Sequence, residues 1–356
     1  MPANSPQKSA QNSAQNSSRD PDWTRPGAYP VGEGIHRIPL PLPLAGLPAV
    51  NVYVLEGPDG LVVVDSGWQS ASTRTALEAG LRQLGHGLDD IDTFLITHMH
   101  WDHYTMAAEL RDTLRCRIQV GAGDRDSILG YDQEDGVYAH RTPLLRAAGA
   151  DDLAAEVESR PLEPYETDIA YGPPDQWLVD GDRTPVADGA LEAISTPGHT
   201  RGHMVFSLDT AGVLFTGDHV LPGVTPAVGN DGHPATSPLR DYLASLHRLL
   251  DRPDAVMLPA HGPVGGSVHT RVKELIGHHD ERLQEILELV GDGRETAMQV
   301  ATAVPWTRRR LRLDELDAVH RMTAVLEVDA HLSVLAERGH VVTQQEGGVR
   351  RFARAR

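Results

Sequence analysis

The sequence predicts a layered α/β fold that carries a helical insertion and a small C-terminal domain. Apolar runs rich in Val, Ile and Leu and bounded by Gly or Pro are typical of strands, and segments with helical spacing alternate with them. This alternation occurs twice, on either side of a mostly helical stretch. Strands that alternate with helices favour an α/β body over an all-β sandwich. With 40% hydrophobic and 23% charged residues, the chain can bury a sizeable core.

The N-terminal half opens with a polar tail. Residues 1–24 are rich in Ser, Asn, Gln, Ala and Pro, and they lack the apolar surface that offsets the entropy of ordering, so we predict a disordered segment. Folded structure is expected from near Gly34. Strands are predicted in GIHRIPLPL, AVNVYVLEG and GLVVVDSG, with GPDG (57–60) as a hairpin turn, followed by a helix in TRTALEAGLRQLG, a strand in IDTFLITH, a helix in YTMAAELRDTL and a strand in CRIQVG.

The stretch at about 123–176 contains helical segments such as TPLLRAAGADDLAAEVESR but no clear strand, so we interpret it as a helical insertion. A second series of strands follows in WLVDGDR, LEAISTPGH, MVFSLDTAG, VLFTGDH and AVMLPAHG, with a helix at about 238–251 between the last two. The layered domain is therefore expected to occupy residues 25–269.

A further domain is predicted over residues 270–356. A chain of 356 residues is long enough for about two domains. From about 268 three helical segments are followed by a short β-hairpin in HVVTQQEGGVRRFARA, which is the order of a winged helix-turn-helix. His278 and His279 lie on the first of these helices and are expected to be solvated. The run Arg308-Arg309-Arg310 is interpreted as a solvated charged segment rather than an RNA-binding one.

Composition excludes several classes of function. Lys and Arg total 32 and Asp and Glu total 50, so the net charge is −18 and nucleic acid is disfavoured as a partner. The single cysteine, Cys116, excludes an intramolecular disulfide and a cysteine-based zinc cluster. No run approaches the roughly 20 apolar residues of a membrane helix, and the first residues lack the apolar core of a secretory signal. We therefore predict a cytoplasmic protein that does not bind membranes.

The strongest chemical signal is His98-Met99-His100-Trp101-Asp102-His103, which comes directly after the predicted strand TFLIT. Side chains two positions apart on a helix point in widely different directions, so these four polar residues cannot share one helix face. On a loop that leaves a strand end they can converge. Imidazoles with a carboxylate are the ligands expected for Zn²⁺ and related metals.

Three further candidates follow downstream, each just after an apolar strand and beside a glycine. They are His199 in TPGHTRGH, Asp218 in FTGDH and His261 in LPAHG. Together with the motif they make a set of five His and two Asp, which suits two metals that share one carboxylate. Two metals about 3.5–4 Å apart would hold a bridging hydroxide, the nucleophile of two-metal hydrolases.

THMHWDH, followed in this order by the isolated His199, Asp218 and His261, resembles the metallo-β-lactamase-fold hydrolase superfamily and its glyoxalase-II-like branch. The resemblance covers roughly residues 34–268 and implies an αββα sandwich. The C-terminal region is similar, by helix order alone, to the winged-helix extension of the lactamase-β-like 2 group of the same superfamily.

The resemblance also implies roles for individual residues. It assigns His98, His100 and His199 to a first metal, Asp102, His103 and His261 to a second, and Asp218 to a bridge between them. The metals would be two zinc ions, with iron or manganese as alternatives. Asp65, in VVVDSG after the third strand, would orient the ligand imidazoles. His203, His219 and His233 lie near the motifs and are expected to be structural histidines with satisfied hydrogen bonds.

The expected chemistry is hydrolysis by a metal-bound hydroxide. The cations lower the pKa of bound water from about 16 to about 7, and Asp102 would take and return the proton. A small-molecule thioester is the leading substrate. A lactone or another ester, and a mononuclear-iron persulfide dioxygenase, remain alternatives, as does a DNA-binding regulator that senses a ligand. A helical cap formed by the insertion would give a pocket over the metals. Tyr131, Tyr138 and Tyr165 could shape that pocket or donate to an oxyanion, although core or surface packing is favoured for each of them. A homodimer is an alternative to a monomer as the assembly in solution.

Overall fold

The computed structural model describes residues 22–44, 46–131, 138, 140–163, 166–167, 169, 171–229, 237–307 and 309–356. Most of the predicted disordered tail, residues 1–21, lies outside the described residues. So do Tyr165, His233 and Arg308, for which the sequence suggested roles.

The first sheet has seven strands in sequence order. They are β1 (Tyr29–Gly32), β2 (Ile35–Leu44), β3 (Leu47–Glu56), β4 (Leu61–Val64), β5 (Ile91–Ile96), β6 (Arg117–Gly121) and β7 (Gln176–Leu178). β1 to β4 pair antiparallel, and β4 to β7 pair parallel. The predicted hairpin turn joins β3 to β4, where the amide of Gly57 donates to the carbonyl of Gly60 at 2.8 Å. The parallel half matters for function, because the carboxyl ends of its strands meet at one edge of the sheet.

The second sheet has five strands in the order β12-β11-β10-β9-β8. Their bounds are β8 (Arg183–Val186), β9 (Gly189–Ser195), β10 (Met204–Leu208), β11 (Val213–Gly217) and β12 (Val256–Pro259). Neighbours pair antiparallel except β11 and β12, which run parallel and are joined through α6 (Pro238–Leu250). β9, β11 and β12 therefore all run in one direction and end at one edge.

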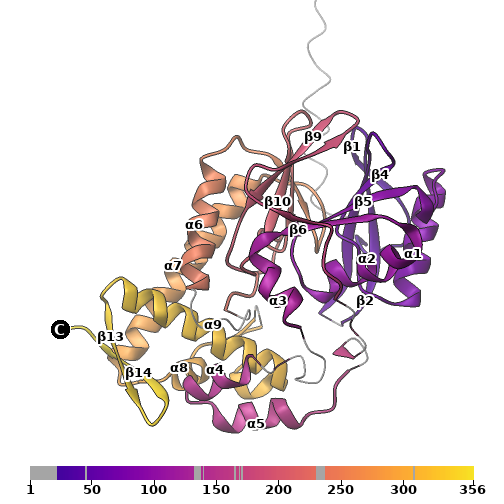
Figure 1. The fold of residues 1–356 in the computed structure, drawn as a ribbon. Coiled ribbons are helices and arrows are strands. Elements are labelled where there is room, and N and C mark those ends of the chain that lie inside the picture. Colours follow the sequence, from indigo (N-terminus) through magenta and orange to yellow (C-terminus); the bar gives the residue numbers. More distant parts are fainter. Residues whose placement is uncertain are drawn as a thin grey trace, which may run out of the picture.

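The two sheets pack face to face, with helices on both outer faces (Figure 1). α1 (Ala71–Gln83), α2 (Trp101–Leu114) and α3 (Arg125–Leu129) cover the first sheet, and α6 and α7 (Val268–Gly291) cover the second. The alternation of side chains along a strand divides the core: Val62 and Val64 pack between the sheets, whereas Val63 packs under the helices. This arrangement is the αββα sandwich that the sequence predicts.

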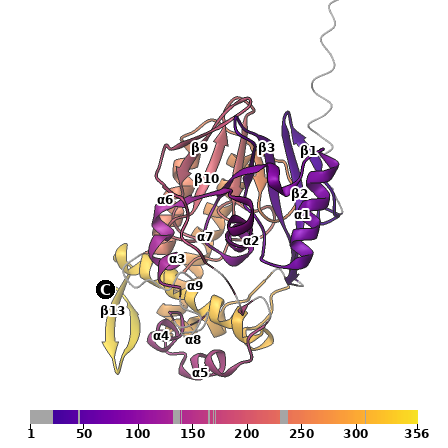
Figure 2. The same cartoon turned by 45° about the vertical axis from the view of Figure 1, so that its right-hand side comes forward.

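Two helices of the insertion, α4 (Thr142–Ala147) and α5 (Asp151–Ser159), pack with the C-terminal helices rather than with the sheets (Figures 1 and 2). The C-terminal elements are α8 (Ala297–Ala303), α9 (Ala318–Glu337) and the hairpin β13 (Val341–Glu346) and β14 (Val349–Arg354). Short 3-10 turns at Leu88–Asp90 and Ala122–Asp124 belong to connections of the first sheet, and one at Leu313–Glu315 precedes α9. Leu145 and Leu153 of the insertion share one hydrophobic cluster with Val300 of α8 and Leu332 of α9. Segments far apart in sequence thus form one helical layer below the sandwich.

The predicted order of three helices and a hairpin is present in the C-terminal region, as α7, α8, α9 and β13–β14. Residues on every side of α9 are buried, including Leu326, Val328 and Leu332. The expectation that His279 is solvated is wrong: its side chain is fully buried. The reason is that α7 packs against both α6 and α9, so the residue faces a second helix instead of water.

The remaining surface expectations concern charge and membranes. Arg309 and Arg310 are exposed, in agreement with a solvated charged segment. Within the described ranges, every helix is too short or too polar to cross a bilayer.

Candidate metal centre

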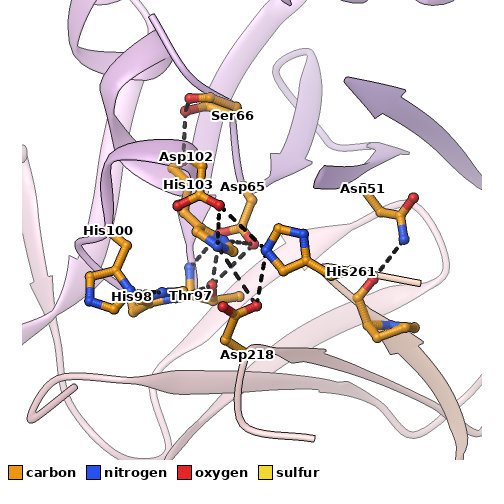
Figure 3. A network of polar contacts seen from close by, with 12 residues as sticks. Asn51, Asp65, Ser66, Thr97, His98, His100, Asp102, His103, Asp218 and His261 are labelled. Carbon is orange, nitrogen blue, oxygen red and sulfur yellow. Dashed lines mark hydrogen bonds and ion pairs between the residues drawn. The ribbon is translucent and has the colours of Figure 1, made fainter. Parts of the chain in front are cut away.

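Six polar residues follow directly or closely on the carboxyl ends of strands from both sheets. They are Asp65 after β4, His98 after β5, Asp124 after β6, His199 after β9, Asp218 after β11 and His261 after β12. Because the strands of each half run in one direction here, their ends meet at one edge of the sandwich. Figure 3 shows side chains from both sheets pointing toward one another at that edge.

The motif from His98 to His103 is divided between a loop and a helix. His98 and His100 lie on the loop, and α2 begins at Trp101, so that Asp102 and His103 occupy its first turn. The expectation of a single loop is therefore only half right. A loop provides the first two side chains, and the approximately 100° turn between successive helical residues separates the next two.

The first group of ligand atoms consists of nitrogens. Nδ1 of His100 lies 2.9 Å from Nε2 of His98 and 3.0 Å from Nε2 of His199. Burial lowers the pKa of His98 and His100 well below its usual range, and neighbouring imidazoles lower it further. The same burial lowers the pKa of His199. These rings are therefore neutral, which is the form that binds a metal.

The second group mixes nitrogens with carboxylate oxygens. Nε2 of His261 lies 3.4 Å from Oδ2 of Asp102 and 3.3 Å from Oδ1 of Asp218. Nε2 of His103 lies 3.6 Å from Oδ2 of Asp102. The other oxygen of Asp218, Oδ2, lies 3.6 Å from Nε2 of His199, in the first group. The two oxygens of Asp218 thus face different groups.

Three buried atoms in the second group have no hydrogen-bond partner among the described residues. They are Nε2 of His103, Nε2 of His261 and Oδ1 of Asp218. A buried polar atom without a partner destabilises a fold, so such atoms indicate a ligand. Sets of His and Asp whose ligand atoms lie within 4.8 Å of one another occur in both groups. The donor set therefore fits metal ions, and the sequence-predicted residues all contribute to it.

Carboxylates dominate the electrostatics of the second group. Burial alone would lower the pKa of His103, but Asp102, Asp65 and Asp218 outweigh it and raise that pKa to about 10. Burial would raise the pKa of Asp102, but His103 and His261 lower it below its usual range. In the metal-free chain, protonated imidazole therefore neutralises the negative charge of these carboxylates. A bound cation would neutralise the same charge in its place.

The outward nitrogen of three imidazoles is tethered. Nδ1 of His103 donates to Asp65 Oδ2 at 2.9 Å. Nδ1 of His199 donates to the carbonyl of Ala227 at 2.7 Å, and Nδ1 of His261 donates to the carbonyl of Ala49 at 2.8 Å. Each of these hydrogen bonds selects the tautomer in which Nε2 carries no proton, so that its lone pair can coordinate a cation. Asp65 holds this position with a φ of 60°, a left-handed conformation that is uncommon outside glycine.

Two residues that support the ligands carried no clear signal in the sequence. Asn51, in the middle of β3, donates to the carbonyls of Pro259 and Gly262 at 3.0 and 2.9 Å, on either side of His261. Asp124 follows β6 and contacts two other ligand loops. Neither is part of a recurring motif, although the dipeptide Gly123-Asp124 after a strand has the same form as the predicted Gly217-Asp218.

The neighbouring histidines behave differently from each other. His203 is satisfied at both nitrogens: Nε2 accepts from the amide of Asp218 at 3.1 Å, and Nδ1 pairs with Thr196 Oγ1 at 2.9 Å. His219 is fully buried, yet both of its ring nitrogens lack a hydrogen-bond partner in the described part of the chain. The expectation of a satisfied residue is therefore wrong for His219, whose ring packs against that of Tyr242 at 4.8 Å.

The tyrosines of the insertion have different surroundings. Tyr138 donates to Glu166 and accepts from Arg160, so its hydroxyl belongs to a charged network. The ring of Tyr131 lies 4.6 Å from that of Tyr171. Tyr171 lies within electrostatic range of Asp102, which raises its pKa together with burial, the larger cause. Tyr131 and Tyr171, both in the insertion, therefore lie in contact with each other near the metal centre.

Comparisons with known proteins agree with this geometry. The family model described as the metallo-beta-lactamase superfamily matches residues 45–261. A crystal structure of a metallo-beta-lactamase family protein from Thermus thermophilus is 30% identical, with a TM-score of 0.73, over 90% of this chain and 99% of that one. The shared structure thus includes the C-terminal helical region as well as the sandwich.

Curated relatives match over shorter stretches. A beta-lactamase-like protein 2 homolog from Caenorhabditis elegans is 32% identical over 40% of this chain and 48% of its own length. An atrochrysone carboxyl ACP thioesterase from Paecilomyces divaricatus is 30% identical over 49% of this chain and 53% of its own length. The chain therefore spans about half the length of these curated relatives. The family model covers more than half of the chain, and the matched region carries the His and Asp side chains that cluster at one edge of the sandwich. The protein therefore belongs to the metallo-beta-lactamase superfamily.

Proposed function

We propose that the protein is a metal-dependent hydrolase of a small-molecule acyl substrate, with a thioester as the leading class. The observation that carries this proposal is the position of Asp218, whose two oxygens face two different sets of imidazoles. A carboxylate placed in this way suits a bridge between two cations. His98, His100 and His199 would hold one cation, and Asp102, His103 and His261 the other. Zinc fits the donor set, and iron or manganese would also accept it.

When bound, two such cations supply a hydroxide nucleophile at neutral pH and neutralise the charge that develops on the carbonyl oxygen. The chain itself positions the metal-binding side chains and provides a group that accepts and returns a proton. Asp102 is buried, and its neighbours His103 and His261 keep its carboxylate ionised. An ionised carboxylate beside the nucleophile can accept its proton and return it to the leaving group, the role we propose for Asp102.

Two observations guide the choice of partner. A relative that is named as a thioesterase supports an acyl thioester as substrate. The burial of α9 argues against the alternative of a DNA-binding regulator, because residues on every side of the helix that would enter a groove are buried in the protein. We therefore propose a small-molecule substrate and no nucleic acid partner. Activity in the cytoplasm stays a prediction from the sequence.

The proposal is tested by metal analysis and a substrate panel. Protein purified without chelator should contain about two metal ions per chain, and it should hydrolyse acyl thioesters faster than lactones or phosphodiesters. The His261→Ala variant, which removes one ligand of the second group, is the matched control and should lose most of that activity. Fewer than one metal per chain would overturn the proposal. One iron per chain with sulfur-dependent oxygen uptake would replace it with a persulfide dioxygenase.

A further inference from the structure

We propose that Asp124 is a positioning residue for the first group of ligands, acting by holding the loop of His98 and His100 against the loop of His199. This inference rests on the proposed two-metal function. It concerns a residue outside the seven side chains that would bind the metals.

The contacts of Asp124 join loops from both sheets. Its carboxylate is fully buried at the end of the turn Ala122–Asp124 that follows β6. Oδ2 accepts from the amide of Met99 at 2.9 Å and from Thr200 Oγ1 at 3.1 Å. Oδ1 accepts from the amide of Gly202 at 2.7 Å. Met99 separates His98 from His100, and Thr200 follows His199, so one side chain fixes the spacing of all three imidazoles.

Glycines allow the two backbones to approach closely enough for these bonds. A Cβ added to Gly121 would collide with the carbonyl oxygen of Gly202, and one added to Gly123 would collide with that of Arg201. A Cβ added to Gly202 would collide with the amide nitrogen of Asp124. Any side chain at this joint would separate the loops, so the close approach is specific to Gly121, Gly123 and Gly202.

The choice of a carboxylate has a physical reason. The two oxygens face the amides of Met99 and Gly202 and the hydroxyl of Thr200, and a carboxylate only accepts, so each oxygen can satisfy the donors on its side. Burying a charge is costly unless it is hydrogen-bonded, and bonds to an ionised acceptor are about twice as strong as neutral ones. An asparagine would present an NH₂ group to at least one donor and would separate one loop from the other.

Asp65 is the counterpart of Asp124 in the other half of the centre. Its Oδ1 accepts from the amide of Thr97, and its Oδ2 accepts from Nδ1 of His103. Asp65 is thus the buried carboxylate behind His103 of the second group, and it also reaches His98 of the first group through Thr97, whose Oγ1 lies 3.0 Å from Nδ1 of His98. Asp65→Asn makes the same chemical change as Asp124→Asn, so it is the matched control in the background that retains the second group.

The test measures metal affinity rather than turnover. Zinc is removed from the intact protein and titrated back in competition with a chromophoric chelator, in two backgrounds that each retain one group. In His261→Ala, which retains the first group, Asp124→Asn should weaken the remaining zinc about 10–100-fold, the usual effect of losing a residue behind a metal ligand. In His199→Ala, which retains the second group, the same change should leave zinc affinity within about threefold, whereas Asp65→Asn should weaken it about 10–100-fold.

A purely structural role for Asp124 would weaken both backgrounds equally, and that result would overturn the proposal. Unchanged affinity in His261→Ala would also overturn it. If the parent protein binds fewer than two metals, the two-metal function itself fails, and the two failures are thereby distinguished. If circular dichroism shows that Asp124→Asn does not fold, Thr200→Val offers a milder change, because it removes only the bond from Thr200 Oγ1. It should weaken zinc binding a few-fold, and only in the His261→Ala background.

Discussion

A strand-end cluster and a helix pair of histidines both lie in the described part of the chain, and they differ in that the cluster has the form of a metal centre. The strand-end cluster comprises His98, His100, His103, His199 and His261. The helix pair comprises His279 on α7 and His331 on α9, with Nδ1 of the first 3.1 Å from Nε2 of the second. Both sets lie in the interior, where every member except the half-buried His100 is buried, and burial lowers the pKa of both members of the helix pair. Burial of imidazoles is therefore not what distinguishes them.

The difference lies in where the hydrogen bonds go. In the helix pair, Nδ1 of His331 donates to the carbonyl of Glu327 at 2.7 Å, and Nε2 of His331 pairs with Nδ1 of His279. Nε2 of His279 has no hydrogen-bond partner among the described residues. In the strand-end cluster, tethers occupy the outward nitrogens and carboxylates surround the inward ones. The comparison teaches that a metal centre needs tethered imidazoles whose free nitrogens meet around buried carboxylates.

The largest expected effect comes from Asp218→Asn. Because Asp218 faces both groups of ligands, the change should lower kcat/KM for the best acyl substrate about a thousandfold or more and lower the metal content. His331→Gln removes an equally buried ring from the helix pair and should retain activity within about threefold. Equal losses in the two variants would break the comparison. Steady-state kinetics and elemental analysis provide the readouts.

Metal removal should affect stability through the strand-end cluster alone. A ligand that binds only the folded state at about 1,000 times its Kd raises the free energy of unfolding by about 4 kcal/mol, so chelation should lower the unfolding midpoint by several degrees. His279→Gln should lower the unfolding midpoints of both the metal-bound and the metal-free protein but keep the difference between these two midpoints, which we call the gap. His98→Ala should narrow that gap. A gap that disappears in His279→Gln would place a cation in the helix pair and contradict our interpretation.

The helix pair should make the protein sensitive to acid. Burial lowers the pKa of His331 to about 4, below the ordinary value of 6.5. Between these two pKa values the unfolded chain binds a proton that the folded chain does not bind. The contribution of His331 to the free energy of unfolding is therefore fully present above about pH 6.5 and is lost as the pH falls toward 4, by up to about 3 kcal/mol. His331→Gln should flatten this part of a denaturation profile recorded from pH 7 to pH 4. An unchanged slope would show that other groups control the acid loss.

The smallest effect is expected at Glu327, on α9 beside the helix pair. Burial raises its pKa to about 7, although Arg282 opposes the shift. The folded chain holds the proton longer than the unfolded one, so this contribution is complete below about pH 4.5 and is lost as the pH rises through 7. Because the side chain is only half-buried, Glu327→Gln should stabilise the protein by about 1 kcal/mol at pH 8 and by nothing at pH 4. Urea denaturation at the two pH values measures the difference, and equal effects at both would contradict a titration origin.

The fold and much of the centre could be predicted because their signals are local. Valine-rich runs such as 61–64 bounded by glycine indicate strands, and His-x-His-x-Asp-His after such a run indicates a ligand loop. The support behind the ligands could not be predicted in the same way. Asp124 and Asn51 act through donors and carbonyls that lie far along the chain, and a buried carboxylate after a strand looks the same in sequence as an exposed turn residue.

The sequence by itself determined which residues form strands and helices and which side chains can bind a metal, because side-chain period and ligand chemistry are properties of short segments. Only the tertiary structure decided that His279 is buried, that the insertion packs on α9, and that Asp124 joins two ligand loops. Each of these depends on which surfaces meet when both sheets and the helical layer close. That meeting depends on contacts between segments up to hundreds of residues apart, which no local pattern records.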